Sequence, residues 1–511
     1  MPSSPSHPST VPTSHIPNKR RFEDSHEQDN ALNTEAASDL RPTNRQRLPP
    51  KPPASLPPKP AFAPQDMDSR LAPSTLGPHP VSSPTTSDPL DAIFLPYPPL
   101  QASPAGSSSR VPFQQPSPVI SFSYTPVTHT QKFDDSALKA FVDPPPGADL
   151  NYGYERWLRK PDERGRLDGL LNAVQIVKEK EAAMALAHDQ GKGKGKEIGA
   201  VAWRGVITKI LTAPYEERDG WELNAMLVNG TLYLEEHLTE AKLKDKNNMD
   251  ARNHKQSYYG YAFESYCTKP IDTNTAAGGS SNDGRRHPPG WSGDVDTNEQ
   301  WCSVVRTKLG DVRLVVGGEV DCVRGKYTGN STDRFVELKT SMSIRGPQDE
   351  GRFEKKLLKF YFQSFLLGVP EIVVGFRTPA GRLTTTQSFR TMELPRMVRG
   401  KPGAWDPQVC LEWGWKVLAA LRAAGGSEAT GVGSTKEGGQ GTELHGSEGG
   451  DRRVWRATFT PGKGVRIRLL DEEELKEVAS DGEHIEDGKR VERIGFLPKW
   501  YWEAQYAGDA S

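Results

Sequence analysis

The sequence predicts an α/β domain with a mixed β-sheet and flanking helices at about residues 117–506, preceded by a long extension without regular structure. Segments with apolar residues at every second position alternate with segments whose apolar residues recur every three or four positions, and these are the periods of strands and helices. Clusters of Asn, Gly and Pro separate the segments. Residues 1–116 are instead rich in Pro, Ser and Thr, with few periodic apolar positions.

The composition narrows the possible classes of protein. The chain has 511 residues, 43 Pro and 48 Gly, with a net charge of −1, and a mean hydropathy of −0.66. A globally basic nucleic-acid binder is excluded, so any nucleic-acid site must be a local concentration of positive charge. No apolar run approaches the roughly 20 residues that span a bilayer. The four cysteines form no CxxC pair, which argues against a zinc ribbon and for a reducing compartment. We expect a soluble, intracellular protein.

The extension at 1–116 is predicted to be disordered. Its segment 49–60 favours polyproline conformations and lacks the apolar residues needed to offset the entropy cost of ordering. Basic clusters at 19–21 and 45–47 fit nuclear import signals, although solvated charge is an equally valid interpretation. We therefore expect a nuclear protein.

The elements of the first half follow from local patterns. We expect strands at 119–124, 200–211, 221–236 and 257–267, with a hairpin turn at Asn229-Gly230. Helices are expected at 137–142 and at about 167–188. Loop insertions are predicted near 189–198 and 272–293, where Gly, Lys, Ser and Asn accumulate.

The second half continues in the same way. Two strands are expected within 304–340 and another at 371–377, with a helix at 347–367 that ends at Gly368. A further helix is expected at 407–424, then an inserted linker at 425–451 that is rich in Gly, Ser, Thr and Glu. Strands at 454–459 and 465–470 precede an acidic run at 471–487, which we expect to be mobile.

Charged residues stand out in the two strands of 304–340. Glu319 and Asp321 share one face of the first strand, and Glu337 and Lys339 share one face of the next, because side chains alternate with period two. Three carboxylates that meet in one cleft bind a hard divalent cation, beside a lysine that can touch a phosphate. The alternative interpretation is that these charges simply end exposed edge strands.

Their order is that of the D…ExK layout of restriction-nuclease-like phosphodiesterases, which the segment resembles. Glu337 follows Asp321 by 16 residues, enough for a turn and the start of another strand. Mg²⁺ keeps several waters, so two or three carboxylates suffice to hold it. Such an ion lowers the pKa of its water and neutralises charge on a phosphate, and the lysine assists.

Further polar residues interrupt apolar segments elsewhere. Glu264 lies among aromatic residues, where a carboxylate is costly without a partner. Arg204 and Arg377 interrupt apolar strands and offer forked donors for phosphate, or else form structural ion pairs. Gln363 lies one helical turn from Lys359, so both can face a ligand. The free thiol of Cys302 is explained equally well as a small buried side chain.

An ordered set of motifs resembles the DXO-type decapping nucleases, which act in quality control of RNA 5′ ends. The motifs are AWRG, GYAFESYC, TNEQWCSVVRTKLG, GGEVDC, VELKTS, KLLKFYFQSFLLGVP and IVVGFR. The resemblance covers about 121–506 and is greatest to the fungal nuclear branch that partners the Xrn-type 5′–3′ exoribonuclease. It implies the following metal ligands: Glu264, Glu319, Asp321, Glu337 and the carbonyl of Leu338. It implies the following substrate contacts: Trp203, Arg204, Gly205, Cys302, Glu319, Lys339 and Gln363. A family arginine is missing near Gln131 and Lys132.

The resemblance also implies an activity. We expect a hydrolase dependent on Mg²⁺, or on Mn²⁺, with Glu319, Asp321, Glu337 and Lys339 as the catalytic residues. Its reactions would remove incomplete caps, NAD caps and the pyrophosphate of 5′-triphosphate RNA. Two alternatives remain open. The protein can act mainly as a binding partner that stabilises the exoribonuclease, or it can be a DNA-cleaving nuclease of the same broad fold.

Overall fold

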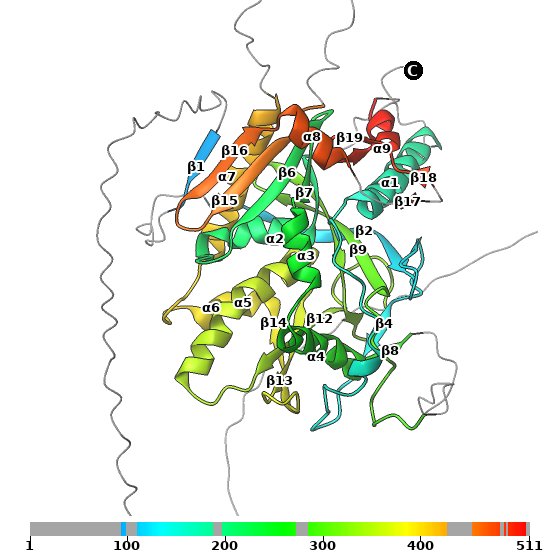
Figure 1. The fold of residues 1–511 in the computed structure, drawn as a ribbon, viewed down its shortest axis with the longest axis vertical. Helices are drawn as coiled ribbons and strands as arrows, with labels where there is room; N and C mark the ends of the chain where they lie inside the picture. The colour runs from blue at the N-terminus through cyan, green and yellow to red at the C-terminus, as the bar shows by residue number, and fades with distance from the viewer. Residues whose placement is uncertain are drawn as a thin grey trace, which may run out of the picture. The chain divides into compact units, whose positions relative to one another are not determined.

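The structure is a computed structural model that describes residues 93–98, 110–187, 197–271, 285–426, 452–480, 485–486 and 489–506. Within these ranges most strands belong to two mixed sheets, with helices packed against both (Figure 1). This arrangement confirms the predicted mixed α/β fold. No helix in the described part of the chain is long and apolar enough to cross a membrane.

Ten of the described strands form the larger sheet. In spatial order they are β1 (Ile93–Pro96), β16 (Gly464–Leu469), β15 (Trp455–Thr460), β6 (Trp221–Val228), β7 (Thr231–Glu236), β5 (Ala200–Trp203), β10 (Val312–Glu319), β9 (Gln300–Leu309), β2 (Phe113–Tyr124) and β3 (Gln131–Lys132). Strand β5 runs parallel to both of its neighbours, β7 and β10. The predicted hairpin joins β6 to β7, and Asn229 and Gly230 both have positive φ, as a type I′ turn requires.

Six described strands form the smaller sheet, which contains Glu337 and Lys339. They are β14 (Leu383–Arg390), β13 (Glu371–Arg377), β12 (Phe335–Met342), β11 (Cys322–Val323), β4 (Lys139–Phe141) and β8 (Thr268–Pro270). Strands β12 and β13 are parallel, and helix α5 (Pro347–Leu367) connects them. The helix ends where Gly368 takes a left-handed conformation, φ 71°, as predicted for its C-cap. Short pairs β17 (Ile485–Glu486) with β18 (Lys489–Arg490) and β19 (Arg493–Ile494) with β20 (Leu497–Pro498) lie outside both sheets.

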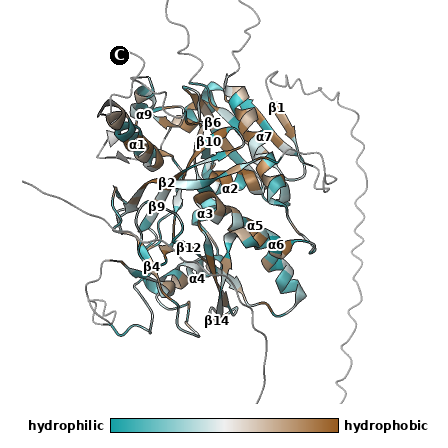
Figure 2. Ribbon diagram, turned by 180° about the vertical axis from the view of Figure 1, so that it is seen from behind, coloured by the Kyte–Doolittle hydropathy of each residue, from teal (hydrophilic) through white to brown (hydrophobic). Residues whose placement is uncertain are grey.

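Helices cover both faces of the larger sheet and both faces of the smaller one. They are α1 (Asp168–Ala187), α2 (Arg204–Thr212), α3 (Glu240–Asn247), α4 (Ala251–Cys267), α5, α6 (Leu394–Val398), α7 (Pro407–Gly426), α8 (Glu472–Ala479) and α9 (Lys499–Ala504); short 3₁₀ turns lie at Tyr154–Arg156, Ala213–Tyr215 and Thr391–Glu393. Leu314 and Val316 of β10 face a core with α2, α5 and α7. The intervening Val315 faces a core with α1 and α9. The helices that pack on the sheets carry both apolar and polar residues along their length (Figure 2).

Several elements differ from those that the sequence predicts. Residues 257–267 form the end of helix α4, not a strand, and 137–142 contain strand β4, not a helix. The predicted strand 200–211 is strand β5 only as far as Trp203, after which α2 begins. Strand β14 was not predicted, since only Leu383 and Phe389 of its residues are buried.

Two segments are more ordered than the composition suggests. Strand β1 lies within the range 1–116 that was predicted to be disordered, and it pairs with β16. Helix α8 lies in the acidic run 471–487, where Asp471 and Glu474 form a capping box. Residues 1–92 and 99–109 of the extension, and most of the predicted insertions near 189–198, 272–293 and 425–451, lie outside the described residues.

Candidate metal-dependent phosphodiester site

The chain passes from the larger sheet to the smaller one within three residues, and the acidic site lies at this crossing. Glu319 is the last residue of β10, and Cys322 begins β11. Asp321 lies between them and accepts a hydrogen bond on Oδ2 from the Leu338 N–H of β12 at 2.6 Å. The Glu-Val-Asp motif thereby places one carboxylate at the end of each sheet.

Helix α4 supplies the facing wall. Glu264 lies in its last turn, and Tyr261 lies one turn earlier on the same side. The helix packs closely on the smaller sheet because Gly375 of β13 has no side chain: a Cβ there would be 2.5 Å from Cε2 of Phe263. The carbonyl of Glu264 also accepts a hydrogen bond from the Thr268 hydroxyl at 2.8 Å. These contacts hold Glu264 toward the crossing of the two sheets.

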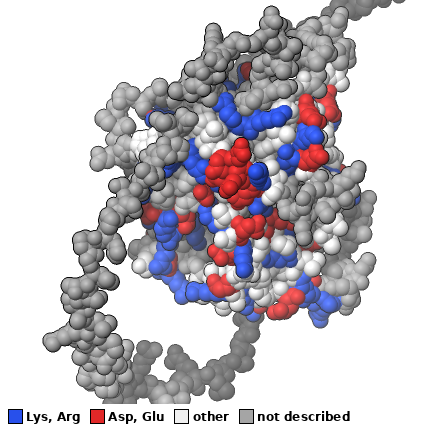
Figure 3. Space-filling view, turned by 45° about the horizontal axis from the view of Figure 1, so that its top comes forward, with Lys and Arg blue, Asp and Glu red and all other residues white. Residues whose placement is uncertain are grey.

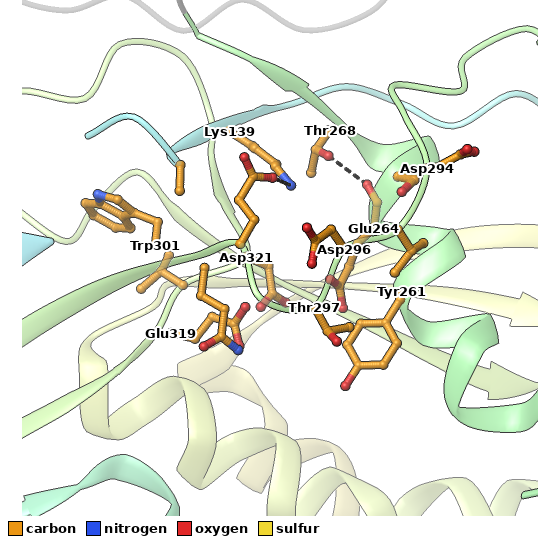
Figure 4. Close-up of a pocket in the computed structure, with 16 residues that line it drawn as sticks. Lys139, Tyr261, Glu264, Thr268, Asp294, Asp296, Thr297, Trp301, Glu319 and Asp321 are labelled. Carbon is orange, nitrogen blue, oxygen red and sulfur yellow. Dashed lines mark hydrogen bonds and ion pairs between the residues drawn. The ribbon is translucent and has the colours of Figure 1, made fainter. Parts of the chain in front are cut away.

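A pocket lies between these walls (Figure 4). Its acidic lining includes Glu264, Glu319 and Asp321, which the sequence analysis assigned to the metal. The remaining residues around it are Ala137, Lys139, Tyr261, Ser265, Thr268, Asp294, Val295, Asp296, Thr297, Glu299, Gln300, Trp301 and Val320. Gln300 donates to Glu319 at 3.2 Å, and Lys139 forms an ion pair with Glu299 at 2.8 Å.

The three carboxylates of the pocket carry unusually high pKa values. Burial raises the pKa of Glu264 well above its ordinary value, and the charges of Asp321 and Glu319 add to this. Burial is also the main reason that the pKa of Glu319 is raised. Burial and the charge of Glu337 raise the pKa of Asp321 to about 7. Burial and the neighbouring carboxylates therefore both disfavour the charged forms of these acids.

A divalent cation fits this donor set. Carboxylate oxygens are the ligands that Mg²⁺ and Mn²⁺ prefer, and a bound cation would relieve the repulsion that raises these pKa values. Among the described residues, no three acidic, histidine or cysteine side chains already lie at mutual distances suited to one ion. An ion held at these positions would therefore complete its coordination with water.

Glu337 belongs to a second group of charges beside the pocket. Its carboxylate is 1% exposed and accepts hydrogen bonds from Arg204 Nη1 at 2.9 Å and from Lys339 Nζ at 2.5 Å. Burial alone would raise the pKa of Glu337, but Arg204 and Lys339 lower it to about 2. The charge of Glu337 is thus balanced within the protein.

Arg204 reaches Glu337 because two glycines leave room for it. Arg204 begins helix α2 and approaches β10, where a Cβ on Gly318 would be 2.9 Å from its own Cβ. A Cβ on the preceding Gly317 would similarly meet the ring of Trp203 at 3.0 Å. The Gly-Gly pair before Glu319 therefore allows the start of α2 to lie against the end of β10.

The other residues assigned to the substrate are placed as follows. The main-chain carbonyl of Gln363 on α5 accepts a hydrogen bond from Arg204 Nη1 at 3.5 Å. Cys302 pairs with Glu319 across β9 and β10, but its thiol is buried in the core, and burial raises its pKa. Trp203 donates from Nε1 to the carbonyl of Arg166 at 2.8 Å. Gly205 is exposed, with nothing within 4 Å of a Cβ built on it.

The structure adds residues that the sequence analysis missed. Tyr261 precedes Glu264 by three residues, so a helical interpretation of this segment would have found it. Lys139 was missed because residues 137–142 were wrongly predicted to form a helix, whereas Lys139 begins strand β4. Near Gln131, where the family arginine is missing, the side-chain amide of Gln131 donates to the carbonyl of Gly169 at 2.8 Å. Lys139 is a cation that does line the pocket.

The strand pair with D…ExK carboxylates at its ends, covered by helices, defines a nuclease fold of the PD-(D/E)XK type. Comparison with known proteins agrees. The sequence pattern of the RAI1-like PD-(D/E)XK nucleases matches residues 114–502. The chain belongs to this family, and it is a nuclease of that fold.

Individual relatives agree with this assignment. The chain is 39% identical over 466 residues to a protein of Mycosarcoma maydis named decapping nuclease RAI1, covering 79% of this chain and 90% of that protein. It is 37% identical over 284 residues to the decapping and exoribonuclease protein of Xenopus laevis, covering 54% and 66%. The crystal structure of S. pombe Rai1 in complex with 3′-FADP has a TM-score of 0.52 at 26% identity, covering 72% and 97%. That of Candida albicans Rai1 in complex with pU5-Mn²⁺ has a TM-score of 0.61 at 22% identity, covering 81% and 99%.

Proposed function

We propose that this protein is a divalent-metal-dependent hydrolase of RNA 5′ ends. Its reactions are the removal of incomplete caps and NAD caps and the release of pyrophosphate from 5′-triphosphate RNA. The observation that carries the proposal is the meeting of Glu264, Glu319 and Asp321 in one pocket at the crossing of the two sheets. The names of the relatives from Mycosarcoma maydis and Xenopus laevis support RNA 5′ ends as the substrate.

We assign the acidic residues to the metal ion and the basic residues to the phosphate. Glu264, Glu319, Asp321 and Glu337 would hold Mg²⁺ or Mn²⁺ together with the carbonyl of Leu338. The ion, when bound, supplies a more acidic water and neutralises negative charge on the phosphate. Lys339 and Arg204 are held near the site by Glu337, ready to donate to phosphate oxygens. Gln363 and the open surface at Gly205 position the 5′ end.

We further propose that the protein acts in nuclear RNA quality control and stabilises an Xrn-type 5′–3′ exoribonuclease. Import would depend on the basic clusters at 19–21 and 45–47. A fluorescent fusion that lacks both clusters should remain outside the nucleus, whereas the complete protein enters it. The purified exoribonuclease should be retained by the immobilised protein, and its inactivation on heating should be slower in the mixture.

The activity is tested directly with RNAs that carry different 5′ ends. The protein is incubated with Mg²⁺ or Mn²⁺ and RNA bearing a triphosphate, an unmethylated cap, a methylated cap or an NAD cap, and the released products are identified. We expect pyrophosphate, a cap dinucleotide and NAD, respectively, from the triphosphate, unmethylated-cap and NAD-cap RNAs. Replacing Glu319 and Asp321 together with alanine should abolish all three reactions. Undiminished hydrolysis by the folded double variant would refute the assignment of the site.

A further inference from the structure

Strand β1 fills a groove at the outer edge of the larger sheet. It pairs antiparallel with β16 over four residues, with Leu95 opposite Val465. Directly after the strand, the Tyr97 N–H donates to the carbonyl of Lys463 at 2.9 Å. Among the described strands β1 is the last of this sheet, and β16 is its neighbour (Figure 1). If β1 were displaced, a row of N–H and C=O groups on β16 would lose its partners.

Alternate side chains of this segment enter the protein. Ile93, Leu95 and Tyr97 are partly buried and pack against the core beside α7, whereas Phe94 is 56% exposed. This is the alternation expected of a strand with one covered face. The groove therefore receives the side chains at the first, third and fifth positions of the segment and leaves the second in solvent.

The fifth position makes the most specific contacts. The ring of Tyr97 stacks on Phe459 with the ring centres 6.3 Å apart, and its hydroxyl donates to the carbonyl of Pro214 in the 3₁₀ turn that follows α2. Burial raises the pKa of Tyr97, and the charges of Glu217 and Glu216 raise it further. The hydroxyl therefore stays protonated and remains a donor. A phenylalanine would fill the same space without donating to Pro214.

Strand β16 begins with a residue that lets another backbone approach. Gly464 lies opposite Pro96 and has a φ of 131°, a conformation that glycine adopts readily because it lacks a Cβ. A Cβ at Gly464 would be 2.0 Å from the carbonyl oxygen of Leu95 and 2.8 Å from the nitrogen of Tyr97. The groove thus accepts an extended chain only because this position carries no side chain.

Charge has no part in holding the segment. On the face shown in Figure 3, Lys and Arg are interspersed with Asp and Glu, and one acidic cluster lies near its centre. By contrast, β1 has the sequence IFLP and carries no charge, and the core against which it packs is apolar. Apolar side chains and main-chain hydrogen bonds therefore select the occupant of the groove.

Strand β1 is an addition to the nuclease domain. The pattern of the RAI1-like nucleases matches residues 114–502, and β1 lies wholly before this range. The elements that form the groove, which are β16, α7 and the turn after α2, all lie within it. Four residues of β1 pair with β16, whereas six residues of β15 do so. The domain thus supplies the groove, and a separate short segment fills it.

We propose that the edge of β16 is a peptide-binding groove, which β1 occupies in cis and which an extended segment of a partner protein enters in its place. The partner segment has large apolar residues at its first and third positions and a tyrosine at its fifth. In such strand addition, main-chain hydrogen bonds give affinity and pockets for alternate side chains give specificity. Because β1 belongs to the same chain, it competes at a high effective concentration. This site does not depend on the proposed hydrolysis.

The test supplies the segment in trans. A fluorescein-labelled peptide of residues 91–99 is titrated with the full chain, and its anisotropy is measured. The variant Leu95→Asp displaces the competing strand, because a carboxylate is costly in an apolar groove, and it should bind the peptide about tenfold more tightly than the wild type. The matched control Phe94→Asp, changed at the exposed position, should bind the peptide as the wild type does.

Changes in the peptide test the pattern of the ligand. In titrations with the Leu95→Asp chain, a peptide with Leu95→Asp should not bind. Tyr97→Phe in the peptide should weaken binding about fivefold, because one hydrogen bond is lost. Phe94→Asp in the peptide should leave binding unchanged, since this side chain faces solvent. Equal losses for the three altered peptides would overturn the groove.

A second variant tests the competition without a charge in the groove. Phe94 lies opposite Arg466, at a separation that a disulfide bridges, so the chain with Phe94→Cys and Arg466→Cys locks β1 in place when oxidised. The oxidised form should bind the peptide less tightly than the reduced form. This comparison decides the question if Leu95→Asp lowers the stability of the whole domain.

Three results would overturn the proposal. The first is equal peptide affinity of the wild type and a folded Leu95→Asp chain, and the second is equal affinity of the oxidised and reduced forms. The third is a wild-type dimer in analytical ultracentrifugation that Leu95→Asp converts to a monomer. In that case the groove would hold the strand of a second copy instead of a segment from a partner protein.

Discussion

The two groups of acids at the crossing of the sheets are neighbours, but their charges are balanced differently. In the pocket, Glu264, Glu319 and Asp321 have raised pKa values, because burial and mutual repulsion exceed the positive charge nearby. Glu337 has two cations at hydrogen-bond distance and a pKa of about 2. The difference identifies the pocket as the part of the site that a divalent cation would stabilise, in line with the proposed function. Glu337, which we propose as a further ligand, is already paired with Arg204 and Lys339 in the folded protein.

The largest expected effect concerns the pocket. Replacing Glu319 with Gln and Asp321 with Asn in one variant should lower hydrolysis of 5′-triphosphate RNA by about 1000-fold or more, because the ion loses two of its ligands. The melting temperature should stay the same or rise, since amides remove buried charges that repel each other. Enzyme assay and calorimetry on the same sample test both statements. A large fall in melting temperature would show that these carboxylates support the fold.

Replacing Glu337 with Gln should instead lower the stability of the protein. Glu337→Gln leaves Arg204 and Lys339 buried beside a neutral amide, and breaking such a buried ion pair costs about 3–5 kcal/mol. Chemical denaturation would measure the change in the free energy of unfolding, with Glu319→Gln as the control. Equal stabilities of these two single variants would remove the distinction between the two groups.

A buried acid outside the site, Glu235, tests whether a single paired cation keeps a buried carboxylate ionised. Glu235 is 2% exposed and accepts hydrogen bonds from Arg166 at 2.7 Å and Asn224 at 3.1 Å. With burial outweighing Arg166, its pKa is raised to about 7. An unfolded glutamate loses its proton near pH 4.5, so the free energy of unfolding should fall by about 3 kcal/mol as the pH rises from 4.5 to above 7.

Glu235→Gln removes this titration, so the variant is the control for the wild type. Denaturation curves of the wild type and the variant should give similar stabilities near pH 5, with the wild type becoming less stable relative to the variant toward pH 8. Parallel pH profiles would mean that Arg166 keeps Glu235 ionised in the folded protein at all these pH values.

The smallest expected effect is the response to a divalent ion without RNA. Mg²⁺ or Mn²⁺ at about 100 times its dissociation constant should stabilise the protein by about 2.7 kcal/mol, and thermal unfolding should show the shift. Asp321→Asn should abolish most of it. A shift of the same size in this variant would place the ion elsewhere.

Much of the fold was predictable because burial has a clear period in the sequence. Leu314, Val315 and Val316 alternate between two cores, as a central strand must. Glu319, Glu337 and Lys339 could be placed from this alternation, since Glu319 ends β10 and Glu337 and Lys339 share one face of β12. Asp321 was predicted to share a strand face with Glu319, but it lies in the crossing between β10 and β11. The two strands belong to different sheets, so the way in which the structure brings these residues together could not be predicted from alternation.

Helix α4 was not predicted because residue propensity and the spacing of apolar residues indicated different structures. Its tyrosines and Phe263 favour strands by propensity, but the buried residues form pairs every four positions, beginning at Tyr258 and Tyr259 and ending at Tyr266 and Cys267. That spacing is helical, and it places the buried residues on one face of the helix, where they pack against β12. The contribution of Lys139 and Asp296 to the pocket depends on contacts far apart in the sequence, which no local pattern contains.

The link between Arg204 and Glu337 joins segments 133 positions apart and belongs to neither sheet alone. Arg204 follows a strand of the larger sheet, and Glu337 lies in the smaller one. Catalytic competence is therefore a property of the assembled domain, because a chain with only one sheet formed has half of the charged groups and no pocket. A nascent or partly denatured molecule would be unable to cut RNA, which makes the activity self-limiting to correctly folded copies.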